Sequence, residues 1–268
     1  MKKTILITGS TDGIGLATAK TLGLLGHTVL LHGRSDSKLK AAKAALEQAG
    51  VSTPIYAYQA DLSSYQQVKQ LIQAIQENHT QLDVLINNAG VFVVNETKTA
   101  DNLDARFMVN TIAPFMLTQA FAGLLGANGR VVNLSSAAQT SVMASELASP
   151  SVLSDSAVYA KSKLAITMWS FALAKAYGTS GPAVIAVNPK SFLGSKMVES
   201  AYGVAGSNLQ IGADILVKAA TSDEFAQASG RYFDNDIGQF SQPHRDALDS
   251  TKNQEIVDAL EQIIEQLN

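Results

Sequence analysis

Short apolar runs alternate along the chain with longer segments in which apolar residues recur every three or four positions. The short runs, which are typical of buried β-strands, span residues 4–8, 28–32, 55–59, 84–87, 130–134, 183–188 and 231–233. The longer segments predict helices at residues 15–25, 38–49, 66–78, 103–125, 158–177 and 209–221. Strand and helix in alternation favour right-handed crossovers and a parallel sheet with helices on both faces. The pattern therefore predicts a doubly wound α/β fold with about seven strands.

Three segments fall outside this alternation. Residues 253–267 carry an apolar stripe that predicts a terminal helix packed on the body or on a partner, with Ile256, Leu260, Ile263, Ile264 and Leu267 on one face. Residues 137–156 and 189–208 are irregular and rich in Ser, Ala and Gly. Ligands of doubly wound sheets bind beyond the carboxyl ends of the strands. Both irregular regions follow a strand, so we expect them to border the substrate site.

Composition narrows the class of protein. The 268 residues are 46% apolar and 16% charged, which allows one large core, so residues 1–268 are predicted to form a single domain. A formal charge of −3 offers no basic surface for nucleic acid or anionic lipid, and small molecules are the expected partners. Cysteine is absent, which excludes disulfides and thiolate chemistry and fits a reducing compartment.

The amino-terminal residues begin with two lysines, but the apolar run that follows ends after three residues at a Thr–Gly turn. They indicate a first strand rather than a signal peptide. No apolar run approaches the roughly 20 residues that span a bilayer, so we expect a cytoplasmic protein without a membrane span. No metal site is predicted, because metal-ligand spacing is lacking among His27, His32, His79 and His244.

Candidate chemistry starts with Tyr159 and Lys163, which lie four residues apart in a predicted helix. Residues i and i+4 share a helix face. An ammonium group at Lys163 can therefore favour the phenolate of Tyr159 and lower the pKa of the phenol from its usual value of about 10. A tyrosine tuned in this way can exchange protons near neutral pH. The bland alternative is an ordinary amphipathic helix surface.

A glycine-rich turn joins the first predicted strand to the first helix. Glycine lets the backbone turn tightly and approach a pyrophosphate, which the amides of a helix N-terminus favour. The spacing Gly-x-x-x-Gly-x-Gly differs from the common Gly-x-Gly-x-x-Gly, but its place at the first strand-to-helix junction favours a Rossmann-type dinucleotide site over a plain turn. The candidate cofactor residues here are Gly9, Ser10, Thr11, Gly13, Ile14 and Gly15.

The end of the second strand bears on the choice of cofactor. An acidic residue there binds the ribose 2′-hydroxyl of NAD, whereas an arginine accommodates the 2′-phosphate of NADP. Asp36 lies 21 residues after Gly15, but it stands just ahead of a helix, where Ser35 or Asp36 is more simply an N-cap. Arg34 follows Gly33 and supplies a guanidinium group. The sequence therefore favours NADP and leaves NAD possible.

Further motifs fall in order at the ends of the predicted strands: Asp61–Leu62, Asn87–Asn88–Ala89–Gly90, Asn110 within Val–Asn–Thr, and Ser135–Ser136. Together with Tyr159 and Lys163 they resemble the short-chain dehydrogenase/reductase family, from about residue 4 to residue 189. The long stretch between Ser136 and Tyr159 is most similar to the retinol-dehydrogenase-like and related reductases.

The resemblance implies a role for each matched position. Gly9, Gly13 and Gly15 match the cofactor turn, with Ser10, Thr11 and Ile14 lining it. Asp61 and Leu62 match the pair beside the adenine, although Asp61 could equally cap the next helix. Asn88, Ala89 and Gly90 match the turn near the adenosine. Asn110 matches the residue that holds a water for a proton relay. Ser136, chosen over Ser135, would hold the substrate oxygen, Tyr159 would be the general acid and base, and Lys163 would bind the nicotinamide ribose.

One segment departs from the family pattern. Pro189 is followed by Lys190 where the family usually has glycine, and the next residues form a slightly longer segment. Pro189 and Ser195 are carried over as contacts to the nicotinamide end of the cofactor, while Lys190 adds a positive charge whose bland explanation is a solvated loop side chain.

These motifs predict an NAD(P)-dependent oxidoreductase that acts on a carbonyl or secondary alcohol. The residues expected to line an apolar pocket for a hydrophobic ketone or aldehyde are Val142, Met143, Leu147, Val152, Leu153, Met197 and Val198. The alternatives are a non-catalytic NADP-binding redox sensor or scaffold, and a nucleotide-sugar epimerase, for which the roughly 80 residues after Pro189 are few. A homodimer or homotetramer through the helices at 103–125 and 158–177 is expected from the resemblance alone.

Overall fold

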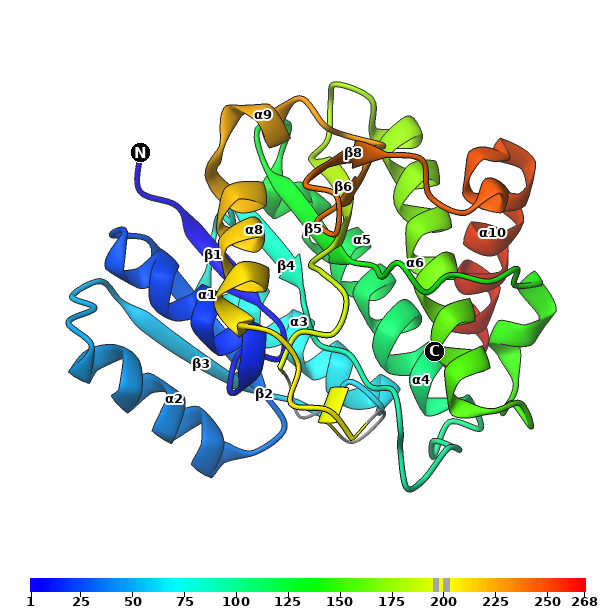
Figure 1. Ribbon diagram of the computed structural model, residues 1–268, viewed down its shortest axis with the longest axis horizontal. Helices are drawn as coiled ribbons and strands as arrows, with labels where there is room; N and C mark the ends of the chain where they lie inside the picture. Colours follow the sequence, from blue (N-terminus) through cyan, green and yellow to red (C-terminus); the bar gives the residue numbers. More distant parts are fainter. Residues whose placement is uncertain (195–197, 200–202) are drawn as a thin grey trace.

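The computed structural model describes residues 1–194, 198–199 and 203–268. Its centre is an eight-stranded sheet in the order β3-β2-β1-β4-β5-β6-β7-β8 (Figure 1). Neighbouring strands are parallel except for β8, which runs antiparallel to β7 at the edge. The strands are β1 (Thr4–Ile7), β2 (Thr28–Gly33), β3 (Ile55–Gln59), β4 (Val84–Asn87), β5 (Arg130–Leu134), β6 (Ala183–Asn188), β7 (Tyr232–Asp234) and β8 (Gln239–Ser241).

Helices cover both faces of the sheet because successive strand side chains point to opposite sides. In β1, Ile5 and Ile7 pack with one set of helices and Leu6 with the other. The first set is α1 (Gly13–Leu24), α2 (Asp36–Gln48), α8 (Leu209–Thr221) and α9 (Asp223–Ala226). The second set is α3 (Tyr65–Asn78), α4 (Ala105–Phe107), α5 (Ala113–Leu125), α6 (Asp155–Tyr177) and α10 (Ser250–Leu267).

The doubly wound prediction is confirmed, and all seven predicted strands are present within a residue or two. The strand that the sequence did not predict, β8, has three residues, which are too few to show an alternation of apolar and polar positions. The predicted helix at 103–125 contains a π-helical turn, η1 (Met108–Ile112), between α4 and α5. Two 3₁₀ turns, η2 (Ala144–Ala148) and η3 (Arg245–Leu248), complete the described elements.

The terminal helix packs on the body of its own chain. Ile256, Leu260 and Ile263 are buried in the same cluster as residues of α6. Helix α6 is buried at every position from Ser162 to Ser170, which is more than two helical turns, so it is covered on all sides. A homodimer that used this buried stretch of α6 would have to displace α10.

The segment Ala105–Leu125 is long and apolar enough to cross a membrane by length and composition, which qualifies the expectation drawn from apolar runs alone. Most of it is buried inside the fold, where its apolar side chains pack with α3 and α6. Core helices that cover a parallel sheet have this composition because they are enclosed on most sides.

Candidate active site

A cleft of about 630 Å³ opens at the carboxyl ends of the parallel strands. The chain order reverses between β1 and β4, and such a switch point is where doubly wound sheets bind ligands. One end of the cleft is formed by the glycine turn after β1 and by the end of β2, and the other by Ser136, Tyr159 and Lys163. The fold thus brings both groups of predicted residues to a single cavity.

Gly9 and Gly15 of the glycine turn pack so closely against the chain's own atoms that a Cβ atom would not fit. Gly9 and Gly13 have φ values of 64° and 54°, which favour glycine. A Cβ atom on Gly15 would lie 2.3 Å from the carbonyl oxygen of Gly9 and 2.5 Å from Asn88 Nδ2. Asp12 caps α1 by accepting a hydrogen bond from the Gly13 amide. This close-fitting turn at a helix N-terminus suits the pyrophosphate of a dinucleotide.

Residues behind the turn hold it in place. Asn88 Nδ2 donates to the carbonyl oxygens of Thr8 and Gly9, at 2.8 and 3.0 Å, and the Ala89 amide donates to Thr8 Oγ1. Ser10, a predicted cofactor residue, is fully buried and does not line the cleft. Its hydroxyl accepts from the His32 amide at 2.9 Å and ties the turn to β2.

His32 is a wall residue that the sequence did not single out. Its Nδ1 accepts a hydrogen bond from the Gly9 amide, and its Nε2 bonds to the Ala60 carbonyl, each at 3.1 Å. These partners require the neutral ring with the proton on Nε2. Burial lowers the pKa of His32 to about 4, because an apolar environment disfavours the imidazolium. The ring therefore supports the glycine turn as a neutral group.

The end of the cleft beside β2 carries two cationic side chains. Exposed Arg34 and Lys38 both line it, and Lys38 is an addition to the predicted set. Asp36 does not line it, since its carboxylate pairs with Lys40 at 2.6 Å on the surface of α2. Ser35 caps that helix, as expected for a serine in this position.

Asp61 and Leu62 line the same end of the cleft. The Asp61 carboxylate accepts hydrogen bonds from the amide and hydroxyl of Ser63, at 2.9 and 2.8 Å. Helix α3 is capped instead by Ser64, so the alternative reading of Asp61 as the helix cap does not hold.

Lys163 is buried, and its ammonium group lies 5.6 Å from the centre of the Tyr159 ring. Its Nζ donates to the carbonyl oxygen of Leu134, at the end of β5, at 2.7 Å. Desolvation lowers the pKa of Lys163 to about 8. The Tyr159 ring also meets Phe92, with ring centroids 4.6 Å apart. Tyr159 thus contacts both an aromatic ring and a cation at the cleft wall.

The structure separates the two candidate serines. The Ser135 hydroxyl is buried and engaged with Thr167 Oγ1 at 2.7 Å and with the Lys163 carbonyl at 3.2 Å. Ser136 is only half-buried, and its hydroxyl accepts from the Ala138 amide at 3.1 Å. A hydroxyl that accepts one bond retains its proton for a substrate oxygen. The preference for Ser136 is consistent with this arrangement.

Asn110 lies behind the cleft wall, fully buried in the π-helical turn. Its side chain exchanges two hydrogen bonds with the backbone of Val91, at 2.8 and 2.9 Å, and donates to Ser162 Oγ at 3.0 Å. Its side-chain donors and acceptor are therefore occupied by protein groups.

The backbone after β6 takes an unusual path at Lys190, whose φ is 132°. Such values strain any residue other than glycine. Asp236, in the turn between β7 and β8, clamps this segment by accepting from Asn188 Nδ2 and from the amide and hydroxyl of Ser191. Pro189 and Lys190 line the cleft. Ser195, also predicted to contact the cofactor, lies outside the described residues.

The apolar wall differs from the predicted one. Of the residues expected to line it, Val198 does so, Leu147 is buried in the core and Val142 packs against it. Met143, Val152 and Leu153 are exposed, and Met197 lies outside the described residues. The apolar side chains that do line the cleft come mainly from the ends of β4 and β6: Val91, Phe92, Val109, Leu134, Phe192 and Leu193.

Residues 3–203 match the short chain dehydrogenase family. The chain belongs to the short-chain dehydrogenase family. Its curated relatives include human polyprenol dehydrogenase, 34% identical over 68% of this chain and 57% of that protein, and human retinol dehydrogenase 13, 30% identical over 87% and 76%. A short chain dehydrogenase from Burkholderia cenocepacia J2315 in complex with NADP superposes with a TM-score of 0.69 at 28% identity, over 88% of this chain and 97% of that one.

Family membership makes this short-chain dehydrogenase an oxidoreductase that uses a nicotinamide dinucleotide. The glycine turn fits that cofactor on its own geometry, because it lies at the N-terminus of α1 and its three glycines line the cleft with backbone atoms alone. The adenosine end would be held by the turn, Asp61 and the residues after β2, and the nicotinamide end would lie toward Tyr159 and Lys163.

Proposed function

We propose that this short-chain dehydrogenase reduces a hydrophobic ketone or aldehyde reversibly, with NADPH as the preferred hydride donor. The observation that carries the proposal is the convergence of Ser136, Tyr159 and Lys163 on one cleft with the glycine turn. The apolar side chains beside Tyr159, Phe92 above all, favour a substrate whose carbonyl carries apolar groups. The dinucleotide, when bound, supplies the hydride.

The chain's own residues handle the oxygen and its proton. Ser136 donates a hydrogen bond to the substrate oxygen, and Tyr159 protonates that oxygen as negative charge develops on it. Lys163 stabilises the tyrosinate that remains and binds the ribose beside it. Because its Nζ is fixed by the Leu134 carbonyl, the charge is in place before the reaction and requires no reorganisation.

The preference for NADP is supported by charge at the adenosine end, where Arg34 and Lys38 line the cleft and Asp36 is turned away in its pair with Lys40. We expect Arg34→Ala combined with Lys38→Ala to raise the KM for NADPH by about tenfold or more, since hydrogen bonds to charged groups contribute about 1.5–3 kcal/mol each. The KM for NADH should change less than twofold. Steady-state kinetics with both cofactors measures this.

Lys40→Ala is the matched control, because Lys40 lies on the same helix and faces Asp36 instead of the cleft. It should leave both KM values near those of the wild type. An unchanged cofactor preference in the double variant would defeat the assignment of the 2′-phosphate site.

A panel of carbonyl compounds tested with saturating NADPH examines the activity itself. Ketones and aldehydes with apolar substituents should be reduced with a lower KM than short polar ones, because the cleft wall is apolar. Nucleotide binding without turnover of any compound would favour a non-catalytic NADP sensor instead.

A further inference from the structure

We propose that Arg106 is a positioning residue, which holds the first turn of α6, and with it Tyr159, through ion pairs to Asp104 and Asp155. The role rests on the proposed function, since it serves the alignment of Tyr159 with a substrate carbonyl. Arg106 itself does not line the cleft.

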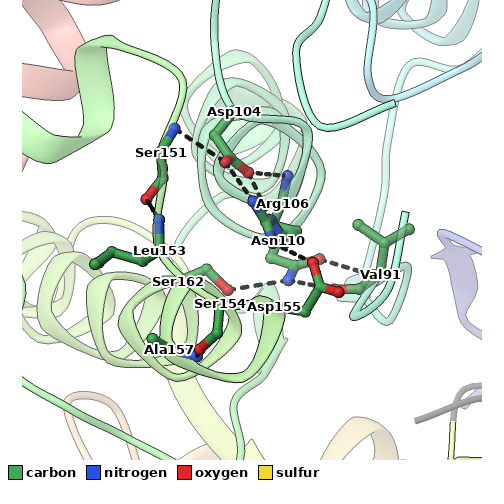
Figure 2. Close-up of polar contacts among 10 residues, drawn as sticks. All are labelled: Val91, Asp104, Arg106, Asn110, Ser151, Leu153, Ser154, Asp155, Ala157 and Ser162. Atoms are coloured by element: carbon green, nitrogen blue, oxygen red, sulfur yellow. Dashed lines mark hydrogen bonds and ion pairs between the residues drawn. The ribbon is translucent and has the colours of Figure 1, made fainter. Parts of the chain in front are cut away.

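The Arg106 guanidinium group joins two carboxylates (Figure 2). Its Nε and Nη2 donate to the two oxygens of Asp104, at 2.9 and 2.7 Å, and its Nη1 donates to Asp155. The side chains of Arg106 and Asp104 are 1% and 0% exposed, whereas that of Asp155 is 38% exposed. Breaking a buried ion pair leaves an uncompensated charge and is strongly destabilising. The pair therefore fixes α4 firmly and presents one donor outward to Asp155.

Asp155 is the first residue of α6, immediately after the cap Ser154. It lies four residues before Tyr159, so the two side chains share a helix face. The loop that leads into α6 is held by the Asp104 carboxylate, because the Ser151 amide donates a hydrogen bond to it at 3.2 Å. The first turn of α6 is thus attached to Arg106 of the buried Arg106–Asp104 pair, and the loop before it is attached to Asp104.

A second attachment lies on the other side of Tyr159. Asn110, four residues after Arg106, donates to Ser162 Oγ, and that hydroxyl donates to the Tyr159 carbonyl at 2.7 Å. Thr111 Oγ1 bonds to the Ser162 carbonyl at 3.0 Å. Along α6, Tyr159 therefore lies between two attachment points, Asp155 and Ser162, whose partners all belong to α4 and the π-helical turn that follows it.

This arrangement has a kinetic consequence. A misplacement of about 1 Å at a reacting group can cost up to 10²-fold in rate. The attachment through Asn110 and Thr111 fixes only the carboxyl side of Tyr159. Loss of the Asp155 attachment would free the amino side of its turn. Turnover should fall while cofactor binding stays, because Lys163 lies beyond the second attachment and its Nζ keeps its bond to the Leu134 carbonyl.

Asp155→Ala tests the link, because it leaves the Asp104–Arg106 pair intact and removes a partly exposed side chain. We expect kcat for carbonyl reduction to fall about tenfold, with the KM for NADPH within twofold of the wild-type value. Amide hydrogen exchange over residues 155–159 should become faster by a similar factor. Asp155→Glu, which keeps a carboxylate within reach of Arg106, should recover most of both properties.

The matched control is Asp223→Ala, which removes the carboxylate of the first residue of α9, after the cap Ser222, at a position outside the cleft lining. It should keep wild-type turnover. Wild-type kcat and exchange in Asp155→Ala would overturn the proposal, and so would a loss of kcat that Asp155→Glu fails to rescue. If the wild type itself reduces no carbonyl, the proposed function fails, and the exchange rates still decide whether Asp155 anchors the helix.

Discussion

Tyr159→Phe is expected to lose a factor of about 10² to 10⁴ in kcat for carbonyl reduction, the usual contribution of a positioned general acid. The substitution removes only the phenolic oxygen. The ring keeps its place against Phe92, 4.6 Å away, and the buried Lys163 keeps its bond to Leu134. Turnover is measured at saturating NADPH, and the Kd for NADPH is measured by fluorescence titration and should stay within a few-fold.

The control is Tyr177→Phe at the carboxyl end of the same helix, where a half-buried tyrosine lies outside the cleft lining. It should retain full activity. Reductase activity that survives in Tyr159→Phe would refute the assignment of this tyrosine as the proton donor.

Lys163→Met is expected to lose turnover to a comparable extent and, unlike Tyr159→Phe, to raise the KM for NADPH as well. The lysine has two roles in the proposed reaction, since it stabilises tyrosinate and binds ribose. An unchanged KM for NADPH in Lys163→Met would refute the role of Lys163 in binding the ribose. Lys175→Met, in the exposed last turn of α6, is the control for loss of a lysine from this helix.

The same variant should reveal the cost of burying the ammonium group. Burial lowers the pKa of Lys163 from 10.5 to about 8, so between these pH values the unfolded chain binds the proton more tightly than the folded one. The contribution of Lys163 to the free energy of unfolding therefore becomes more favourable as the pH rises from about 8 to 10.5. Below about pH 8 the full cost is present, on the order of 3 kcal/mol at 1.36 kcal/mol per pKa unit.

Urea unfolding without cofactor at pH 7 and pH 10 measures this linkage. The free energy of unfolding of the wild type should increase relative to that of Lys163→Met as the pH rises, because Met does not titrate. An equal change in the free energy of unfolding of the two proteins between pH 7 and pH 10 would mean that Lys163 keeps its ordinary pKa in the folded state.

Much of the site could be read from the chain because its parts are local. The glycine turn is seven consecutive residues, and Tyr159 and Lys163 are one helical turn apart, so the relation within each group needs no knowledge of distant contacts. Asp36 was separable from Arg34 for the same reason, since helix capping is decided within a few residues.

Other parts depended on contacts between residues far apart in sequence. His32 and Lys38 belong to the cleft only because β2 ends beside the glycine turn. Some of the residues expected to form an apolar pocket do not line the cleft. Leu147 is buried in the core instead, because an apolar loop residue can pack into the core as readily as line a cavity. The sequence also left open whether the apolar stripe of α10 packs on its own chain or on another. The packing of α10 against α6 answers that question.

By itself, the sequence determined the order of strands and helices, the doubly wound class and the chemical groups of the site, because periodicity, turns and short motifs act over a few residues. The tertiary structure decided which of the two serine hydroxyls is buried and engaged by the protein, that of Ser135, and how Tyr159 is held in place. Arg106 and Asp155 are 49 residues apart, and no local pattern predicts an ion pair between them. That pairing requires two helices to pack at one register, which only the complete core specifies.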